Sequence, residues 1–167
     1  GEVLFLAAKG YAGINHAYDA AGNSILDAYV DADENPVAIS TGTSEVRRTY
    51  NERKQKVEDS YWKLSGEPNV LTDGYASISY AYNEAGRLTD LYYYDGEGKP
   101  ALFKGSTHTV RTYDAAGNMT SEVYYAAAEG GEEASFHPEG YHGMSYTYDS
   151  GNHRLTERFL GAQGEVL

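Results

Sequence analysis

The stretch Gly74-Tyr75-Ala76-Ser77-Ile78-Ser79-Tyr80-Ala81-Tyr82-Asn83-Glu84-Ala85-Gly86-Arg87 decides the interpretation of the chain, because versions of it occur five times in 167 residues. In each copy a glycine stands eight residues before a tyrosine, and an aromatic residue stands eleven residues after it. These anchors are Gly10, Tyr18, Tyr29; Gly42, Tyr50, Tyr61; Gly74, Tyr82, Tyr93; Gly105, Tyr113, Tyr124; and Gly140, Tyr148, Phe159. The central tyrosines lie 32, 32, 31 and 35 residues apart, and a fixed period of this size indicates a repeat architecture.

The leading glycines divide the chain into five repeats. They span residues 10–41, 42–73, 74–104, 105–139 and 140–167, the last of which is truncated. Residues 1–9 match the tail of a preceding repeat, because both ends of the chain fall at the same phase of the pattern. We therefore expect further repeats of the same chain beyond this sequence, in an array whose units pack mainly on their neighbours.

Each repeat reads as two strands joined by a turn. In repeat three, Ala76, Ile78, Tyr80 and Tyr82 alternate with small or polar residues, which is typical of a strand with one buried face. The segment Tyr113–Asn118, Tyr-Asp-Ala-Ala-Gly-Asn, has the residues of a tight reversal into a second strand. A second reversal ends on Pro36, Pro68 or Pro100. The prediction is an all-β repeat array of antiparallel β-hairpins, either a twisted meander or a β-solenoid-like sheet.

Two repeats depart from this pattern. Repeat two has no glycine in its first turn, residues 51–56, so we expect that turn to be looser or longer than the others. Repeat four carries an acidic, glycine-rich insert at residues 126–133. We expect this insert to be an exposed or disordered loop.

Composition narrows the functional classes. The formal net charge of −12 argues against nucleic-acid binding, which needs clustered Lys and Arg on the phosphate backbone. The chain has no cysteine, so disulfides, thiolate metal sites and a cysteine nucleophile are excluded. No apolar run approaches the roughly 20 residues of a membrane helix, and we expect no membrane insertion.

The motif Tyr-Asp-x-x-Gly-Asn, present at Tyr18–Asn23 and at Tyr113–Asn118, resembles the tyrosine-aspartate (YD) repeats of bacterial Rhs proteins and related large surface and toxin-shell proteins. The segment 148–152 is a contracted version of it and 82–87 a divergent one. The resemblance implies β-hairpin sheets that are not themselves enzymes, in an extracellular or cell-surface bacterial protein. The period of about 32 residues and the proline-containing second turn are atypical for that family, and five repeats look too few to close a shell.

The 17 tyrosines allow two interpretations. Those at the anchor positions are explained first as the core of a thin sheet, because aromatic pairs across strands stabilise it by about 0.2–1 kcal/mol each. Rings outside the anchors are better candidates for an exposed surface on which a ligand could stack. These possible ligand-stacking residues are Trp62, Tyr92, Tyr94 and Tyr125.

No residue pattern singles out a catalytic, cofactor-binding or metal site. Asp31, Asp33 and Asn35 alternate as calcium ligands do, but Pro36 stands where a calcium loop has glycine. We expect no cofactor and no enzymatic activity. The preferred function is a non-catalytic scaffold or adhesion module of a bacterial surface or secreted protein, with a protein or glycan partner possible. The alternatives are a carbohydrate- or cell-wall-binding module and a fragment of a glycoside hydrolase.

Overall fold

The structure is a computed structural model that describes residues 10–167; the expected tail of a preceding repeat, residues 1–9, lies outside the described residues. It is all-β, and the prediction of a repeat array of antiparallel hairpins is confirmed. The strands form one meander sheet that is not closed, in the order β1-β2-β3-β4-β5-β6-β7-β8-β10-β11, with β9 paired to β8. Among residues 10–167 there is no helix long and apolar enough to cross a membrane.

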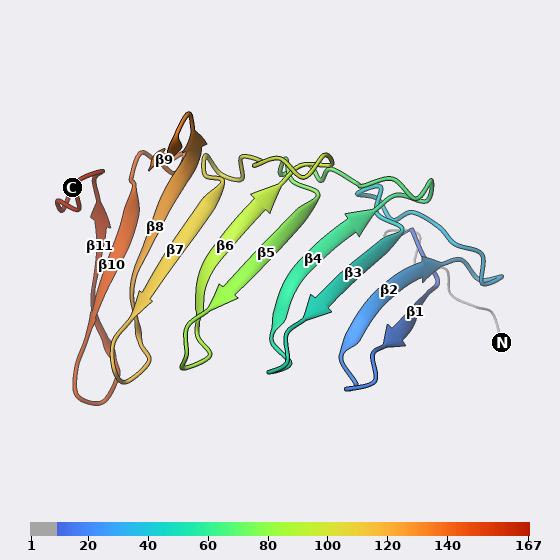
Figure 1. The fold of residues 1–167 in the computed structure, drawn as a ribbon, viewed down its shortest axis with the longest axis horizontal. Helices are drawn as coiled ribbons and strands as arrows, with labels where there is room; N and C mark the ends of the chain where they lie inside the picture. The colour runs from blue at the N-terminus through green and yellow to red at the C-terminus, as the bar shows by residue number, and fades with distance from the viewer. Residues whose placement is uncertain (1–9) are drawn as a thin grey trace. The chain divides into compact units, whose positions relative to one another are not determined.

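Each repeat contributes one hairpin, and repeat four adds a second between β8 and β9 (Figure 1). The strands are β1 (Gly13–Tyr18), β2 (Ser24–Val30), β3 (Glu45–Tyr50), β4 (Lys56–Trp62), β5 (Ser77–Tyr82), β6 (Leu88–Tyr94), β7 (His108–Tyr113), β8 (Met119–Ala128), β9 (Gly131–Ala134), β10 (Gly143–Tyr148) and β11 (Arg154–Leu160). The chain forms two compact units. Of the described residues, one unit contains 10–78 with Tyr94–Lys99, and the other contains Ser79–Tyr93 with Pro100–Leu167.

The first turn of every repeat has the same hydrogen bonds. In repeat one, Asp19 N donates to Asn23 O and Gly22 N donates to Asp19 O, while Asp19 Oδ1 accepts from the backbone N–H groups of Ala21 and Asn23. A register shift precedes the central tyrosine, between Ala17 and Tyr18. A five-residue loop of this kind reverses the chain with a bulge and requires a left-handed residue at its fourth position.

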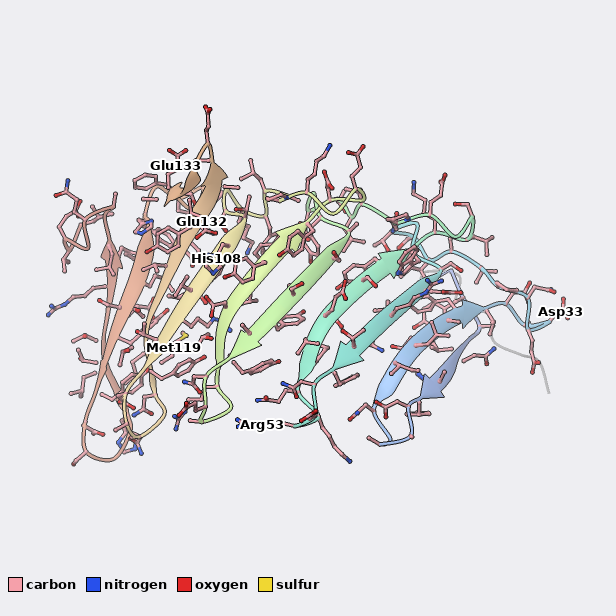
Figure 2. The ribbon with its side chains drawn as sticks, viewed as in Figure 1. Asp33, Arg53, His108, Met119, Glu132 and Glu133 are labelled. Carbon is pink, nitrogen blue, oxygen red and sulfur yellow. The ribbon has the colours of Figure 1, made fainter. Side chains whose placement is uncertain are left out.

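The turn of repeat two is neither looser nor longer, so that expectation is wrong. Asn51 N donates to Gln55 O, and Lys54 N donates to Asn51 O, as in the other repeats. Lys54 occupies the place of the missing glycine with φ of 59°. The Asn51 side chain, which accepts from the N–H groups of Arg53 and Gln55, holds the loop even without glycine. Figure 2 shows Arg53 at the tip of this turn.

Repeats one to four each contain a third reversal that the sequence pattern did not reveal. In repeat one, Ile39 N donates to Thr43 O and Gly42 N donates to Ile39 O, so the leading glycine lies inside a turn and not at the start of a strand. All five leading glycines have φ between 77° and 96°, a conformation that favours glycine. The anchor glycines are therefore set by turn geometry.

The insert of repeat four is a hairpin and not a disordered loop. Residues of β8 from Tyr125 to Ala128 pair with β9 from Ala134 back to Gly131. Gly130 and Gly131 adopt positive φ at the reversal. Most of the insert is exposed, as expected, but its backbone groups are paired because the glycines allow a tight turn within it.

Candidate functional site

The central tyrosines join consecutive hairpins. The Tyr50 hydroxyl donates to Ser24 O at 3.1 Å, the Tyr113 hydroxyl to Leu88 O at 2.6 Å, and the Tyr148 hydroxyl to Met119 O at 2.8 Å. Each acceptor is the first residue of the second strand in the preceding hairpin. These anchor rings are therefore structural, in agreement with the core interpretation, although the bond to the neighbouring repeat was not foreseen.

A hollow in the second unit is the best-formed candidate for a binding site. We call it the Arg111 hollow; it has a volume of about 240 Å³. Its floor comes from β6, β7 and β8, and its rim comes from the two turns that contain Gly105 and Gly140. It is lined by Tyr93, Phe103, Lys104, Ser106, Thr109, Arg111, Glu122, Tyr124, His137 and Tyr141.

A charged pair lies in the floor of the Arg111 hollow. Arg111 Nε donates to Glu122 Oε2 at 2.7 Å, and the Tyr124 hydroxyl donates to the other oxygen, Glu122 Oε1, at 2.7 Å. Burial and then the hydrogen bond to Glu122 raise the pKa of Tyr124 well above its usual range. Each carboxylate oxygen of Glu122 therefore accepts one hydrogen bond, Oε2 from Arg111 and Oε1 from Tyr124. These bonds fix the orientation of the carboxylate, and both of its oxygens are engaged, so Glu122 is not free to act as a base.

Aromatic rings form the walls of the hollow. Tyr93 contacts Phe103 with ring centroids 4.9 Å apart. His137 stacks on Tyr141 at 4.7 Å with an interplanar angle of 18°, and Tyr124 lies 6.1 Å from each of them. Rings packed in this way present rigid apolar surface with little loss of rotamer entropy. Aromatic walls with a few oriented polar groups are the usual composition of a small-ligand site.

The other face of the same strands carries a second aromatic cluster, because neighbouring residues of a strand point to opposite faces. His108 is 6% exposed and stacks on Tyr92 at 4.0 Å, with Tyr125 at 6.0 Å. His108 Nε2 lies 3.0 Å from Asp90 Oδ1, and Nδ1 lies 3.0 Å from both carboxylate oxygens of Glu132. Figure 2 shows His108 close to Glu132 of β9. The contact between His108 of β7 and Glu132 of β9 holds the β8–β9 hairpin against β7.

The four ligand-stacking candidates are half-buried and are divided between the two units. Tyr92 and Tyr125 lie in the second unit, where both contact His108. Trp62 and Tyr94 belong to the first unit. Arg47 covers the Trp62 ring at 4.2 Å, and Trp62 Nε1 donates to Ser60 Oγ at 2.9 Å. Ligand stacking at these residues stays a prediction.

Sequence reasoning missed the Arg111 hollow as a site. Tyr93 and Tyr124 were identified only as anchors, whereas Phe103, His137 and Tyr141 come from the turns between hairpins. The signal that could have found it is the aromatic residue that stands one or two positions from the leading glycine in several repeats, such as Tyr11, Tyr75, Phe103 and Tyr141.

The acidic turn residues bind the backbone. Asp31 Oδ1 accepts from the N–H groups of Asp33 and Asn35 at 2.9 Å, and these hydrogen bonds with Asn35 and Asp33 lower the pKa of Asp31 below its usual value. Figure 2 places Asp33 in the loop that follows β2. Within residues 10–167 no group of three or more His, Asp or Glu side chains is arranged to hold a metal ion.

No protein-family model matches the chain, and no curated protein matches it in sequence. The resemblance to tyrosine-aspartate repeats therefore stays an expectation based on the short motif alone.

Proposed function

We propose that the chain is a non-catalytic scaffold segment of a bacterial surface or secreted protein. The observation that supports this most directly is the hydrogen bond from the central tyrosine to the preceding hairpin, which recurs at Tyr50, Tyr113 and Tyr148. Because each junction uses the same contacts, further repeats can be added to the array without a new kind of contact. The surface or secreted location rests on the resemblance to tyrosine-aspartate repeats.

Force applied between the two ends of the chain tests the scaffold role. If hairpins are added and removed as units, the chain should extend in several steps. A repeat of about 32 residues releases roughly 10 nm when fully extended. A single extension step that releases the whole chain would contradict a scaffold made of separate hairpin units. A chain that extends without measurable resistance would contradict a scaffold that withstands force.

Binding of carbohydrate is a second candidate function, which the Arg111 hollow favours. Its aromatic walls offer flat apolar surface to the C–H face of a sugar ring. The Arg111–Glu122–Tyr124 group offers oriented hydrogen bonds to hydroxyls. The hollow of about 240 Å³ suits one sugar ring of a longer glycan, whose remaining units would lie in solvent.

A panel of soluble oligosaccharides and cell-wall fragments tests this second function, with affinities measured by calorimetry. Phe103→Ala should weaken binding by about tenfold or more, since it removes a wall of the hollow. Phe136→Ala is the matched control, because Phe136 is an exposed phenylalanine that does not line the hollow. Trp62→Ala tests the alternative surface in the first unit. Equal losses of affinity in Phe103→Ala and Phe136→Ala would exclude the Arg111 hollow as the binding site.

A further inference from the structure

We propose that the Arg111 hollow binds an acidic glycan, and that the guanidinium of Arg111 holds the carboxylate of one of its sugar units. The inference rests on carbohydrate binding, the second function proposed above, and names the class of sugar. It is carried by a comparison between repeat two and repeat four. Both have an arginine two residues before the central tyrosine, but only the arginine of repeat two is bonded to two acidic side chains.

Repeat two shows the complete arrangement. Arg48 of β3 faces Asp59 of β4 in the same hairpin, and its Nε lies 3.5 Å from Asp59 Oδ1. Its Nη2 donates to Asp27 Oδ2 in the preceding hairpin at 2.6 Å. The hydrogen bond from Arg48 is the largest cause that lowers the pKa of Asp27 below its usual value. The arginine at this position therefore holds two carboxylates, one from its own hairpin and one from the hairpin before it.

Repeat four has only the first of these carboxylates. Arg111 holds the place of Arg48 and faces Glu122 of β8 in the same hairpin. Its Nε donates to Glu122 Oε2 at 2.7 Å. The two Nη groups of Arg111 have no acceptor within residues 10–167, and 29% of the side chain is exposed. A guanidinium presents its donors as a planar fork that fits a carboxylate.

The second carboxylate is replaced by an apolar side chain. Where β2 pairs with β3, Asp27 faces Val46. Where β6 pairs with β7, Leu91 faces Thr109, and both Val46 and Thr109 stand four residues after a leading glycine. Leu91 therefore occupies the place of Asp27 and has no side-chain acceptor for Arg111. The side of the guanidinium that binds an acidic residue in repeat two is open to a ligand in repeat four.

The charge of the hollow also favours a ligand with one carboxylate. Arg111 and Lys104 both line it, and Lys104 is exposed and has no acidic partner in the part of the chain that the structure describes. Glu122 is the only acidic side chain of the lining. His137 Nδ1 lies 3.6 Å from Glu139 Oε2. The hollow is thus locally positive in a chain of net charge −12, and one ligand carboxylate would balance it.

The aromatic walls favour a sugar over an acidic peptide. The pair Tyr93 and Phe103 and the stacked pair His137 and Tyr141 offer flat apolar faces to a ligand. A hexuronic acid has a C–H face that can lie on such rings and a carboxylate at the edge of its own ring. An Asp or Glu side chain supplies the carboxylate without the flat face. A site of this composition binds best a ligand that uses both its rings and its few polar groups.

Calorimetry with short hexuronic acid oligosaccharides tests the proposal. The panel consists of glucuronate, galacturonate and mannuronate oligomers, each measured beside its methyl ester, which has the same sugar and linkage but no charge. At least one acid should bind about tenfold or more tightly than its ester, since hydrogen bonds to a charged group are stronger than those to a neutral one. A peptide of six aspartates tests the acidic-peptide alternative and should not bind.

Leu91→Asp is the decisive variant, because it places in repeat four the carboxylate that Asp27 supplies in repeat two. It should occupy the open side of Arg111 and weaken binding of the acid by about tenfold or more. Leu91→Asn is the matched control, which has the same size without the charge and should weaken binding by no more than about threefold. Lys104→Gln should also weaken binding of the acid. Lys63→Gln removes the same charge from an exposed lysine of the first unit and should not.

The possible outcomes separate this inference from the proposed function. Equal affinities for acids and esters would overturn the inference and leave carbohydrate binding standing. Equal losses in Leu91→Asp and Leu91→Asn would overturn it as well, because the charge beside Arg111 would then have no role. Binding of the aspartate peptide in place of the uronates would assign the hollow to an acidic protein. If no sugar binds at about millimolar concentration, carbohydrate binding and the inference are both rejected. Far-UV circular dichroism confirms that each variant is folded.

Discussion

The Tyr113 hydroxyl donates to the carbonyl oxygen of Leu88 across 2.6 Å and so joins two consecutive hairpins. Removing only this hydroxyl, with Tyr113→Phe, should lower the free energy of unfolding by about 1 kcal/mol, because the Leu88 carbonyl loses its side-chain donor while the ring stays in place. Urea unfolding followed by circular dichroism measures the change.

Tyr18→Phe is the matched control for Tyr113→Phe. Tyr18 holds the same place in its hairpin but is 61% exposed, so the loss of its hydroxyl should leave the stability of the dilute chain within about 0.5 kcal/mol of the parent. Equal losses in the two variants would mean that the bond between hairpins contributes nothing.

A second prediction concerns backbone strain in the turn after β2. Glu34 has φ of 65°, which costs a residue with a Cβ about 1–2 kcal/mol. Glycine removes that cost but loses about 0.5–1 kcal/mol through the greater freedom of the unfolded chain. Glu34→Gly should therefore raise the free energy of unfolding by about 0.5–1 kcal/mol. Glu52→Gly, in a turn position without positive φ, should lower it, and denaturant unfolding distinguishes the two.

The hairpins could be predicted from the sequence because their causes are local. The alternation Ala76, Ile78, Tyr80, Tyr82 and the Asp, Gly and Asn residues of the turns each act within a few positions. The third reversal was missed because its turns, such as Ile39–Thr43, lack the Asp or Asn that stands at the first position of most of the other turns. The leading glycine marked its position, but was assigned to the start of a strand.

The Arg111 hollow was not predicted because it depends on how the turns between hairpins fold back onto the strands. Phe103 and Tyr93 are ten residues apart in sequence, and their rings meet only because the chain folds back onto β6. His137 and Glu122 come together in the same way. The burial of His108 between Asp90 and Glu132 was also not predicted from the sequence, because it depends on the insert forming the β8–β9 hairpin.

A third prediction concerns acid. The side-chain amide and backbone N–H of Asn118 are the largest causes that lower the pKa of Asp114 in the folded chain, and the backbone N–H of His153 is the largest cause for Asp149. A carboxyl whose folded pKa is depressed stabilises the chain above the unfolded pKa of about 4, and this contribution is lost as pH falls through the lower folded value. The melting temperature should therefore fall steeply below about pH 4.

Asparagine at the same position provides the control, since Asn51 and Asn83 occupy it naturally. The amide oxygen accepts the same backbone N–H groups, as Asn51 Oδ1 does, but does not titrate. A chain with Asp114→Asn and Asp149→Asn should keep its melting temperature near neutral pH and lose less of it in acid. An unchanged acid profile would assign acid sensitivity to other carboxylates, such as Asp27, whose pKa the Arg48 guanidinium lowers.

The last prediction concerns the insert of repeat four, which the contact between Glu132 and His108 fastens to β7. Both oxygens of Glu132 lie 3.0 Å from His108 Nδ1, and the Glu132 side chain is 41% exposed. Solvent screening at that exposure limits the contribution of the contact to about 0.5–1 kcal/mol. Glu132→Ala should therefore open the β8–β9 hairpin locally, with amide hydrogen exchange in Gly131–Ala134 accelerated about twofold to fivefold while the rest of β7 and β8 keeps its protection. Glu133→Ala removes the neighbouring carboxylate, for which the cluster has no role, and should leave exchange unchanged. If both variants accelerate exchange equally, the hairpin is held by its backbone pairing to β8 and His108 is not its fastening.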